Sequence, residues 1–351
     1  MNQSSRPHVI DADGHFCEPW RIWKEYTAAK WHDLVPRSVG KDARGYEIIR
    51  FAGADMVAYP LGSGASITPG GTMPEMVMTT WEEGHPGGFD PRLRLRDMDL
   101  EGIDQAVLYP SFGIGLNAFP EAELVIEMCR AENRFLHEYC AEDPRRLFGV
   151  ATLPMSAPEV AAEELRRCVE KWDFVAAMVH PKPCQQYTLR SPELEPVWAM
   201  AERLEVPIAL HPTDGRYLPM GFEHLFSNFF EQCQLGFTVA SQVALLQVLF
   251  TGLLDRHPRL RFVVLESDIG WLPSLLDHMD LRFKLQRSFM TAPVRELPSE
   301  TFARHCAIAG EAEERILGAA LALLPEGTFM FSTDYPHSES EFPETVKEVL
   351  E

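Results

Sequence analysis

Eight short apolar runs, each ending in polar residues, constrain the fold of this chain more than any other sequence feature. They occupy residues 8–15, 105–111, 146–154, 174–181, 206–212, 261–268, 305–310 and 328–337. Runs that are apolar at almost every position are typical of strands buried on both faces of a parallel sheet. The segments between most of them have helix-like patterns, as at 120–144, 157–172 and 191–205, and a long apolar stretch at 225–258 predicts one or two helices.

Eight strands that alternate with helices predict an α/β fold of the (β/α)8 TIM-barrel type, with a doubly wound open sheet as the alternative. We expect a single barrel domain over residues 1–351. Residues 20–90 break the alternation with a predicted hairpin at 45–60 and a Gly/Pro-rich stretch at 60–74. We interpret them as a long insertion after the first strand that covers the mouth of the barrel.

The composition excludes several classes of partner. A formal net charge of −20 argues against nucleic acid and anionic membranes, because both require a basic surface. The seven cysteines are scattered without a Cys-x-x-Cys pair, which argues against a disulfide framework or a thiolate zinc cluster. The N-terminus has no apolar signal region and no apolar run approaches the length of a membrane span. We therefore expect a cytoplasmic protein with a small-molecule substrate.

Residues able to bind a cation or to move a proton gather at the carboxyl ends of the predicted strands. They are Asp13, His15, His180, His211, Glu266, Asp334 and His337. A barrel brings the carboxyl ends of all its strands to one face, so we expect these side chains to converge. Carboxylates and imidazoles together suit a divalent ion such as Zn²⁺, Mn²⁺, Fe²⁺ or Mg²⁺.

Taken singly, several of these residues have ordinary structural explanations. His211 precedes Pro212 and would suit a turn, Glu266 could cap the next helix, and His180 could be hydrogen-bonded at the rim of the barrel instead of touching a substrate carboxylate. Asp334 is harder to explain, because a buried acid at the end of an apolar strand is costly unless it is paired or metal-bound. The arginines in "PRLRLRDMD" (91–99) are interpreted as an exposed helix face.

Four motifs together resemble the amidohydrolase superfamily, in the branch that includes aminocarboxymuconate-semialdehyde decarboxylase and γ-resorcylate decarboxylase. They are "DADGHFCEP", "HPTDG", "ESDIGWLP" and "FSTDYPH". The resemblance implies a metal-dependent hydrolase-like barrel with one divalent metal, Zn²⁺ by preference and Mn²⁺ or Fe²⁺ as alternatives. The ligands that it implies are Asp13, His15, His211 and Asp334. It also implies a homodimer or a higher homo-oligomer.

The resemblance implies a non-oxidative decarboxylase of a small aromatic or enol carboxylate. Glu266 stands where the decarboxylases have a histidine, so we assign it as general acid or base, with Asp334 and His180 as the other catalytic candidates. We assign substrate contacts to Glu18, His337 and Trp271, and His337 would also orient Asp334. One alternative is hydrolysis of an amide, ester, lactone or C–C bond by metal hydroxide, and another is an inactive barrel that binds a ligand.

Overall fold

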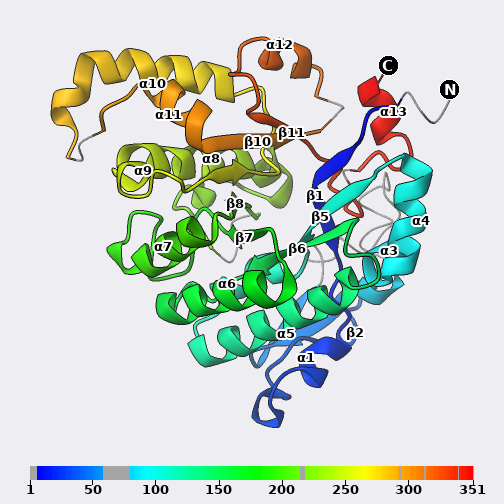
Figure 1. Ribbon diagram of the computed structural model, residues 1–351. Coiled ribbons are helices and arrows are strands. Elements are labelled where there is room, and N and C mark those ends of the chain that lie inside the picture. The colour runs from blue at the N-terminus through cyan, green and yellow to red at the C-terminus, as the bar shows by residue number, and fades with distance from the viewer. Residues whose placement is uncertain are drawn as a thin grey trace. The chain divides into compact units, whose positions relative to one another are not determined.

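The computed structural model describes residues 6–57, 80–213, 218–291, 294–311, 314–338 and 340–350. Its main sheet has the strand order β1-β5-β6-β7-β8-β9-β10-β11 (Figure 1). The bounds are β1 (Ile10–Phe16), β5 (Gln105–Pro110), β6 (Leu147–Thr152), β7 (Ala176–Val179), β8 (Ile208–Leu210), β9 (Phe262–Val264), β10 (Cys306–Gly310) and β11 (Phe329–Phe331). This order follows the chain without a reversal, whereas a doubly wound sheet reverses at a switch point. The (β/α)8 barrel fold is therefore confirmed and the doubly wound alternative is wrong.

Each of the eight strands lies within or across its predicted run, but several end well before it does. The run 328–337 contributes only Phe329–Phe331, and the run 261–268 contributes only Phe262–Val264. The polar residues beyond these strands include Glu266 and Asp334, whose φ angles are +44° and +53°. Extended backbone cannot adopt positive φ, so the strands stop before these residues.

Helices follow the strands as the pattern predicted. They are α4 (Pro91–Glu101), α5 (Ala122–Cys140), α6 (Pro158–Trp172), α7 (Glu195–Leu204), α8 (Phe229–Phe250), α9 (Leu253–Arg256), α10 (Leu272–Gln286), α11 (Pro298–His305), α12 (Leu317–Leu321) and α13 (Thr345–Leu350). The long apolar stretch forms two helices, α8 and α9. Proline occupies the first turn of α4, α6 and α7, where its missing N–H group has no partner to lose.

One compact unit comprises Met1–Gly113, Arg130–Val150 and Phe331–Glu351. In it β1 pairs with β5 in parallel on one side. On the other side the chain after β11 lies along β1, because Asp334 N donates to Asp13 O at 3.0 Å and His15 N donates to Tyr335 O at 2.7 Å. The last strand connection is thereby joined to the first strand, as closure of a barrel requires.

The insertion after β1 belongs to the same unit. It contains α1 (Arg21–Glu25), the antiparallel strands β2 (Arg37–Lys41), β3 (Glu47–Phe51) and β4 (Ala54–Val57), and α3 (Pro86–Phe89). The predicted hairpin is confirmed as β3 and β4, and β2 adds a strand that the sequence did not predict. Residues 58–79, which hold the Gly/Pro-rich stretch, lie outside the described residues. The mouth-covering role and the single-domain organisation stay predictions.

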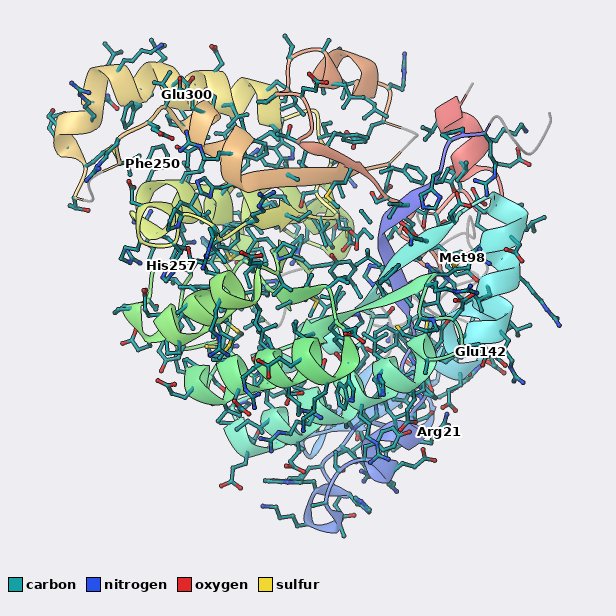
Figure 2. All side chains as sticks on the ribbon, viewed as in Figure 1. Arg21, Met98, Glu142, Phe250, His257 and Glu300 are labelled. Carbon is teal, nitrogen blue, oxygen red and sulfur yellow. The ribbon has the colours of Figure 1, made fainter. Side chains whose placement is uncertain are left out.

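Helix α4 corrects the interpretation of its arginines. Arg92 and Arg96 are exposed as expected, but Arg94 is only 1% exposed. Arg94 shares the buried side of α4 with Met98, which is labelled in Figure 2. We interpreted the arginines of this helix as exposed because charged residues recur along it. Arg94 and Met98 nevertheless share one face, because residues four apart on a helix do so.

The other compact unit comprises Ile114–Cys129 and Ala151–Met330. It holds the parallel strands β7 to β10, with α6 packed against α7 and α10 against α11. Its helix α8 is, over Glu231–Phe250, long and apolar enough to cross a membrane by length and composition alone. We predicted helices but no membrane span for this stretch, because polar residues interrupt its apolar runs. In the structure α8 packs against α9 and α11, and an apolar core helix passes the same test.

Candidate metal centre

The centre is built on β1, whose residues 11–16 are all buried. Asp13 is 1% exposed and His15 is fully buried. Burial raises the pKa of Asp13 well above its ordinary value, and the nearby carboxylates of Asp334 and Asp11 raise it further. Buried acids that lie close together repel one another unless a cation or a proton lies among them.

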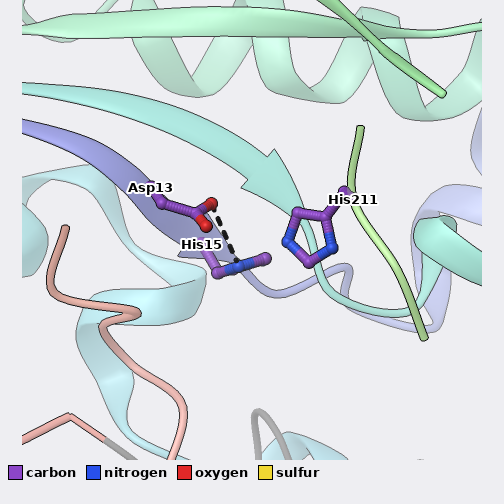
Figure 3. Close-up of side chains that lie close together, drawn as sticks. All are labelled: Asp13, His15 and His211. Carbon is purple, nitrogen blue, oxygen red and sulfur yellow. Dashed lines mark ion pairs between the residues drawn. The ribbon is translucent and has the colours of Figure 1, made fainter. Parts of the chain in front are cut away.

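His15 faces two of these carboxylates. Its Nε2 lies 3.2 Å from Asp334 Oδ1 and 3.6 Å from Asp13 Oδ1, and Figure 3 shows the second pair. Its Nδ1 lies 2.8 Å from the carbonyl oxygen of Pro110. A carbonyl oxygen only accepts, so this contact places the proton of a neutral ring on Nδ1 and turns the Nε2 lone pair toward the acids.

His337 completes this group. Its Nδ1 lies 2.9 Å from Asp334 Oδ1, and its ring stacks on that of His15 with centroids 3.9 Å apart. Ser111 Oγ lies 3.0 Å from His337 Nε2. Ligand atoms of His15, Asp334 and His337 all lie within 4.8 Å of one another, which fits a metal-binding group. The predicted role of His337 in orienting Asp334 agrees with this contact.

His211 follows β8 and is fully buried. Its Nδ1 lies 3.0 Å from the Pro212 carbonyl oxygen and 3.3 Å from Glu266 Oε2. Two acceptors at Nδ1 place the proton of a neutral ring there and leave Nε2 with a free lone pair. A common ion for His211, Asp13 and His15 stays a prediction.

His180 directly follows β7, at the start of the next loop. Its Nδ1 lies 3.0 Å from the Lys182 carbonyl oxygen, and Thr213 N donates to its Nε2 at 3.2 Å. Burial lowers its pKa to about 4, so the ring is neutral at pH 7. Both ring nitrogens thus serve the backbone, as the rim explanation predicted, and the contact to substrate stays a prediction.

Glu18 and Trp271, predicted to touch substrate, also bond to backbone groups. The buried Glu18 carboxylate accepts N–H bonds from Phe112 at 2.9 Å and from Gly113 at 2.8 Å. Burial raises the pKa of Glu18 to about 7, although both hydrogen bonds lower it. Trp271 donates from Nε1 to the Ser267 carbonyl at 2.6 Å. Their substrate contacts remain predictions.

Sequence reasoning missed three residues around this centre. Ser111 ends the run that forms β5, so the strand-end rule that selected Asp13 could also have selected it. Thr333 donates from N and Oγ1 to the carboxylate of Asp11. Arg94 reaches the backbone of the centre from α4. No local pattern marks Thr333 or Arg94, because their partners are far away in the sequence.

The donor set fits a divalent cation. Asp13 and Asp334 supply carboxylate oxygens, and His15 supplies an imidazole nitrogen directed at them. Mixed carboxylate and imidazole sites are typical of Mn²⁺, Fe²⁺ and Zn²⁺. A cation would also offset the burial and the carboxylate repulsion that raise the pKa of Asp13. The residues present therefore pass the chemical test for a metal site.

The family model described as Amidohydrolase matches residues 10–348. The γ-resorcylate decarboxylase of Rhodococcus jostii (strain RHA1) is 32% identical over 275 residues, covering 74% of this chain and 81% of that protein.

Solved structures show the same fold. An amidohydrolase from Mycobacterium avium subsp. paratuberculosis K-10 has a TM-score of 0.79 at 20% identity, with 98% of this chain and 92% of that chain covered. A dihydroxybenzoic acid decarboxylase from Polaromonas sp. JS666, with bound manganese and the inhibitor 2-nitroresorcinol, has a TM-score of 0.65 at 21% identity, with 98% and 90% covered. At these identities the likeness concerns the fold alone.

Proposed function

Because this chain belongs to the amidohydrolase family, we propose that it is a divalent-metal-dependent decarboxylase of small hydroxylated aromatic carboxylates. The observation that carries the proposal is His15 Nε2 directed at Asp334 and Asp13 in a buried site. The substrate class follows from the names of two similar proteins, a γ-resorcylate decarboxylase and a dihydroxybenzoic acid decarboxylase.

We propose Asp13, His15, His211 and Asp334 as the metal ligands. Two carboxylates and two imidazoles favour a harder ion than a thiolate site does, and manganese is bound in a structural neighbour. We therefore prefer Mn²⁺ to the Zn²⁺ expected from the sequence. A bound divalent ion would act as a Lewis acid toward the carboxylate and adjacent hydroxyl oxygens of the substrate.

Glu266 is our candidate for the proton donor. Its side chain is 22% exposed at the end of β9, so it can exchange protons with solvent, and His211 Nδ1 holds its Oε2 at 3.3 Å. Glu266 would deliver a proton to the ring carbon that bears the carboxylate. The bond between that carbon and the carboxylate then breaks, its electron pair returns to the ring, and CO₂ leaves. The balance is one carboxylate and one proton consumed, and one arene and one CO₂ formed.

The test loads purified protein with Mn²⁺ and measures CO₂ from a panel of hydroxybenzoates. We expect Asp334→Ala to lose both bound Mn²⁺ and turnover. Glu266→Gln should keep Mn²⁺ and lose turnover about 10²-fold or more, as loss of a general acid does. Asp268→Asn is the matched control, because Asp268 is an exposed acid two residues farther along the same loop.

Two outcomes would overturn the proposal. Hydrolysis of an amide, ester or lactone panel without CO₂ release would make the protein a hydrolase. Absence of bound metal under every loading condition would make it a ligand-binding barrel. Full turnover by Glu266→Gln would leave the decarboxylase intact and reject Glu266 alone.

A further inference from the structure

Arg94 is a buried cation that the proposed chemistry does not use. Its Nη1 donates to the carbonyl oxygen of His15 at 2.9 Å and to that of Tyr335 at 3.2 Å. Its Nη2 lies 3.5 Å from Asp11 Oδ2, and its guanidinium lies 4.4 Å from the centre of the Tyr335 ring. One side chain thus contacts β1 and the chain after β11, the two segments that present Asp13, His15 and Asp334.

The segment after β11 needs such support. Asp334 has a φ of +53°, a strained conformation that residues with a side chain rarely adopt. The residues on both sides of it are anchored. Thr333 donates to Asp11 from N at 3.1 Å and from Oγ1 at 2.8 Å, and the Tyr335 carbonyl accepts from His15 N and from Arg94. Arg94 contacts both anchoring groups, because it lies against Asp11, which accepts from Thr333, and donates to the Tyr335 carbonyl oxygen.

Gly14, between two of the proposed ligands, leaves room for this arrangement. A Cβ atom on Gly14 would lie 2.3 Å from Arg94 Nη2 and 2.6 Å from Asp11 Oδ2. Atoms cannot approach so closely, so any larger residue would displace the guanidinium or Asp11. The sequence Asp-Gly-His on β1 is therefore matched to Arg94 on α4.

We propose that Arg94 is a positioning residue that sets the geometry of the metal centre by clamping the backbone at His15 and Tyr335. Its hydrogen bonds to His15 and Tyr335 go to backbone carbonyl oxygens, so it acts by fixing the distance between the two segments that bear the proposed ligands. This inference rests on the proposed metal site.

The test compares Arg94→Gln, Arg94→Lys and the control Arg96→Met, which removes an exposed arginine from the same helix. Free Mn²⁺ measured by electron paramagnetic resonance gives the metal affinity without any turnover. We expect Arg94→Gln to bind Mn²⁺ about 10- to 100-fold more weakly, the range for lost support of metal ligands. Arg94→Lys should recover only part of this loss, because an ammonium group cannot hold two carbonyls as a planar fork does.

Chemical rescue separates positioning from general destabilisation. Arg94, Thr333 and Tyr335 line a small pocket, and shortening Arg94 to alanine would add to it the space of a guanidinium group. Guanidinium, far below denaturing concentration, should restore Mn²⁺ binding to Arg94→Ala and leave Arg96→Met unchanged. Gly14→Ala, which keeps Arg94 but takes its space, should bind Mn²⁺ as weakly as Arg94→Gln.

The results distinguish the inference from the function on which it rests. If the native protein binds no Mn²⁺, the proposed metal site fails. If the native protein binds Mn²⁺ and Arg94→Gln binds it equally well with the same spectrum, the clamp is wrong and the metal site stands. If Arg94→Gln does not fold, Arg94→Lys and Gly14→Ala decide in the same way.

Discussion

Two acids, the half-buried Asp97 and the fully buried Glu18, show how hydrogen bonds and burial compete at a single residue. Asp97 accepts from His85 Nε2 at 2.8 Å and from the hydroxyl of Tyr335, and these bonds lower its pKa although burial opposes them. Glu18 accepts two backbone N–H groups, yet its deeper burial raises its pKa to about 7. A carboxylate so placed is only partly ionised at neutral pH.

Glu18 should therefore make the stability of the protein depend on pH. An unfolded glutamate has a pKa of about 4.3, so the folded state binds this proton more tightly. The contribution is complete below about pH 4 and is lost as pH rises through about 7. Between about pH 4 and about pH 7, the free energy of unfolding of the native protein should fall by about 3 kcal/mol more than that of Glu18→Gln.

Urea unfolding at a series of pH values measures this difference. Because the comparison uses the change with pH, any constant cost of the substitution cancels. Glu142→Gln, at an exposed site, should keep the native pH dependence. Identical pH curves for native protein and Glu18→Gln would show that Glu18 does not titrate in this range.

Single residues differ in how far the sequence predicts them. The convergence of Asp13, His15 and Asp334 could be predicted, because all three follow apolar runs whose carboxyl ends meet at one face of a barrel, and His15 does face both acids. Their role as metal ligands stays a proposal. Arg94 could not be predicted. Its hydrogen bond to Tyr335 spans 241 positions of sequence, and only tertiary packing decides which side of α4 is covered.

At the scale of elements, the eight strands could be predicted and their ends could not. An apolar run signals burial, but the last hydrogen-bonded residue depends on the backbone angles of the residues beyond it. Positive φ angles occur at Glu266, Asp268 and Asp334. Residues other than glycine rarely adopt such angles, and no sequence pattern predicted them here. Strand β2 was missed because four of its five residues are exposed, so it has no apolar alternation.

The junction between β1 and the segment after β11 gives an element-scale prediction. Thr333 Oγ1 donates to Asp11 Oδ2 at 2.8 Å and accepts from Tyr335 N at 3.2 Å. Thr333→Val keeps the shape and removes both bonds, which leaves buried polar groups of Asp11 and Tyr335 without that partner. We expect a loss of about 1–3 kcal/mol in the free energy of unfolding, measured with urea.

The matched control is Thr188→Val, because Thr188 is exposed and its replacement should change stability by less than about 0.5 kcal/mol. If Thr333→Val were as stable as the control, the side-chain hydrogen bonds of Thr333 would contribute nothing to the free energy of unfolding.

At the scale of the whole molecule, charge links folding to metal binding. The chain carries a net charge of −20, and its fold buries Asp11, Asp13 and Asp334 close to fully. Arg94 faces Asp11, but burial and neighbouring acids still raise the pKa of Asp13 well above its ordinary value. The folded protein without a cation is thus less stable than its apolar core alone would make it.

Adding Mn²⁺ should therefore stabilise the native protein. Which of the native protein and Asp13→Asn is the more stable should depend on whether Mn²⁺ is present. A cation that binds only the folded state adds about 2.7 kcal/mol at a free concentration one hundred times its Kd. In EDTA we expect Asp13→Asn to be at least as stable as the native protein, because a buried charge has been removed. In Mn²⁺ the native protein should be the more stable of the two, while Asp268→Asn follows the native protein in both buffers. Thermal unfolding of the three proteins in EDTA and in Mn²⁺ measures this, and an equal response of native protein and Asp13→Asn to Mn²⁺ would remove Asp13 from the metal centre.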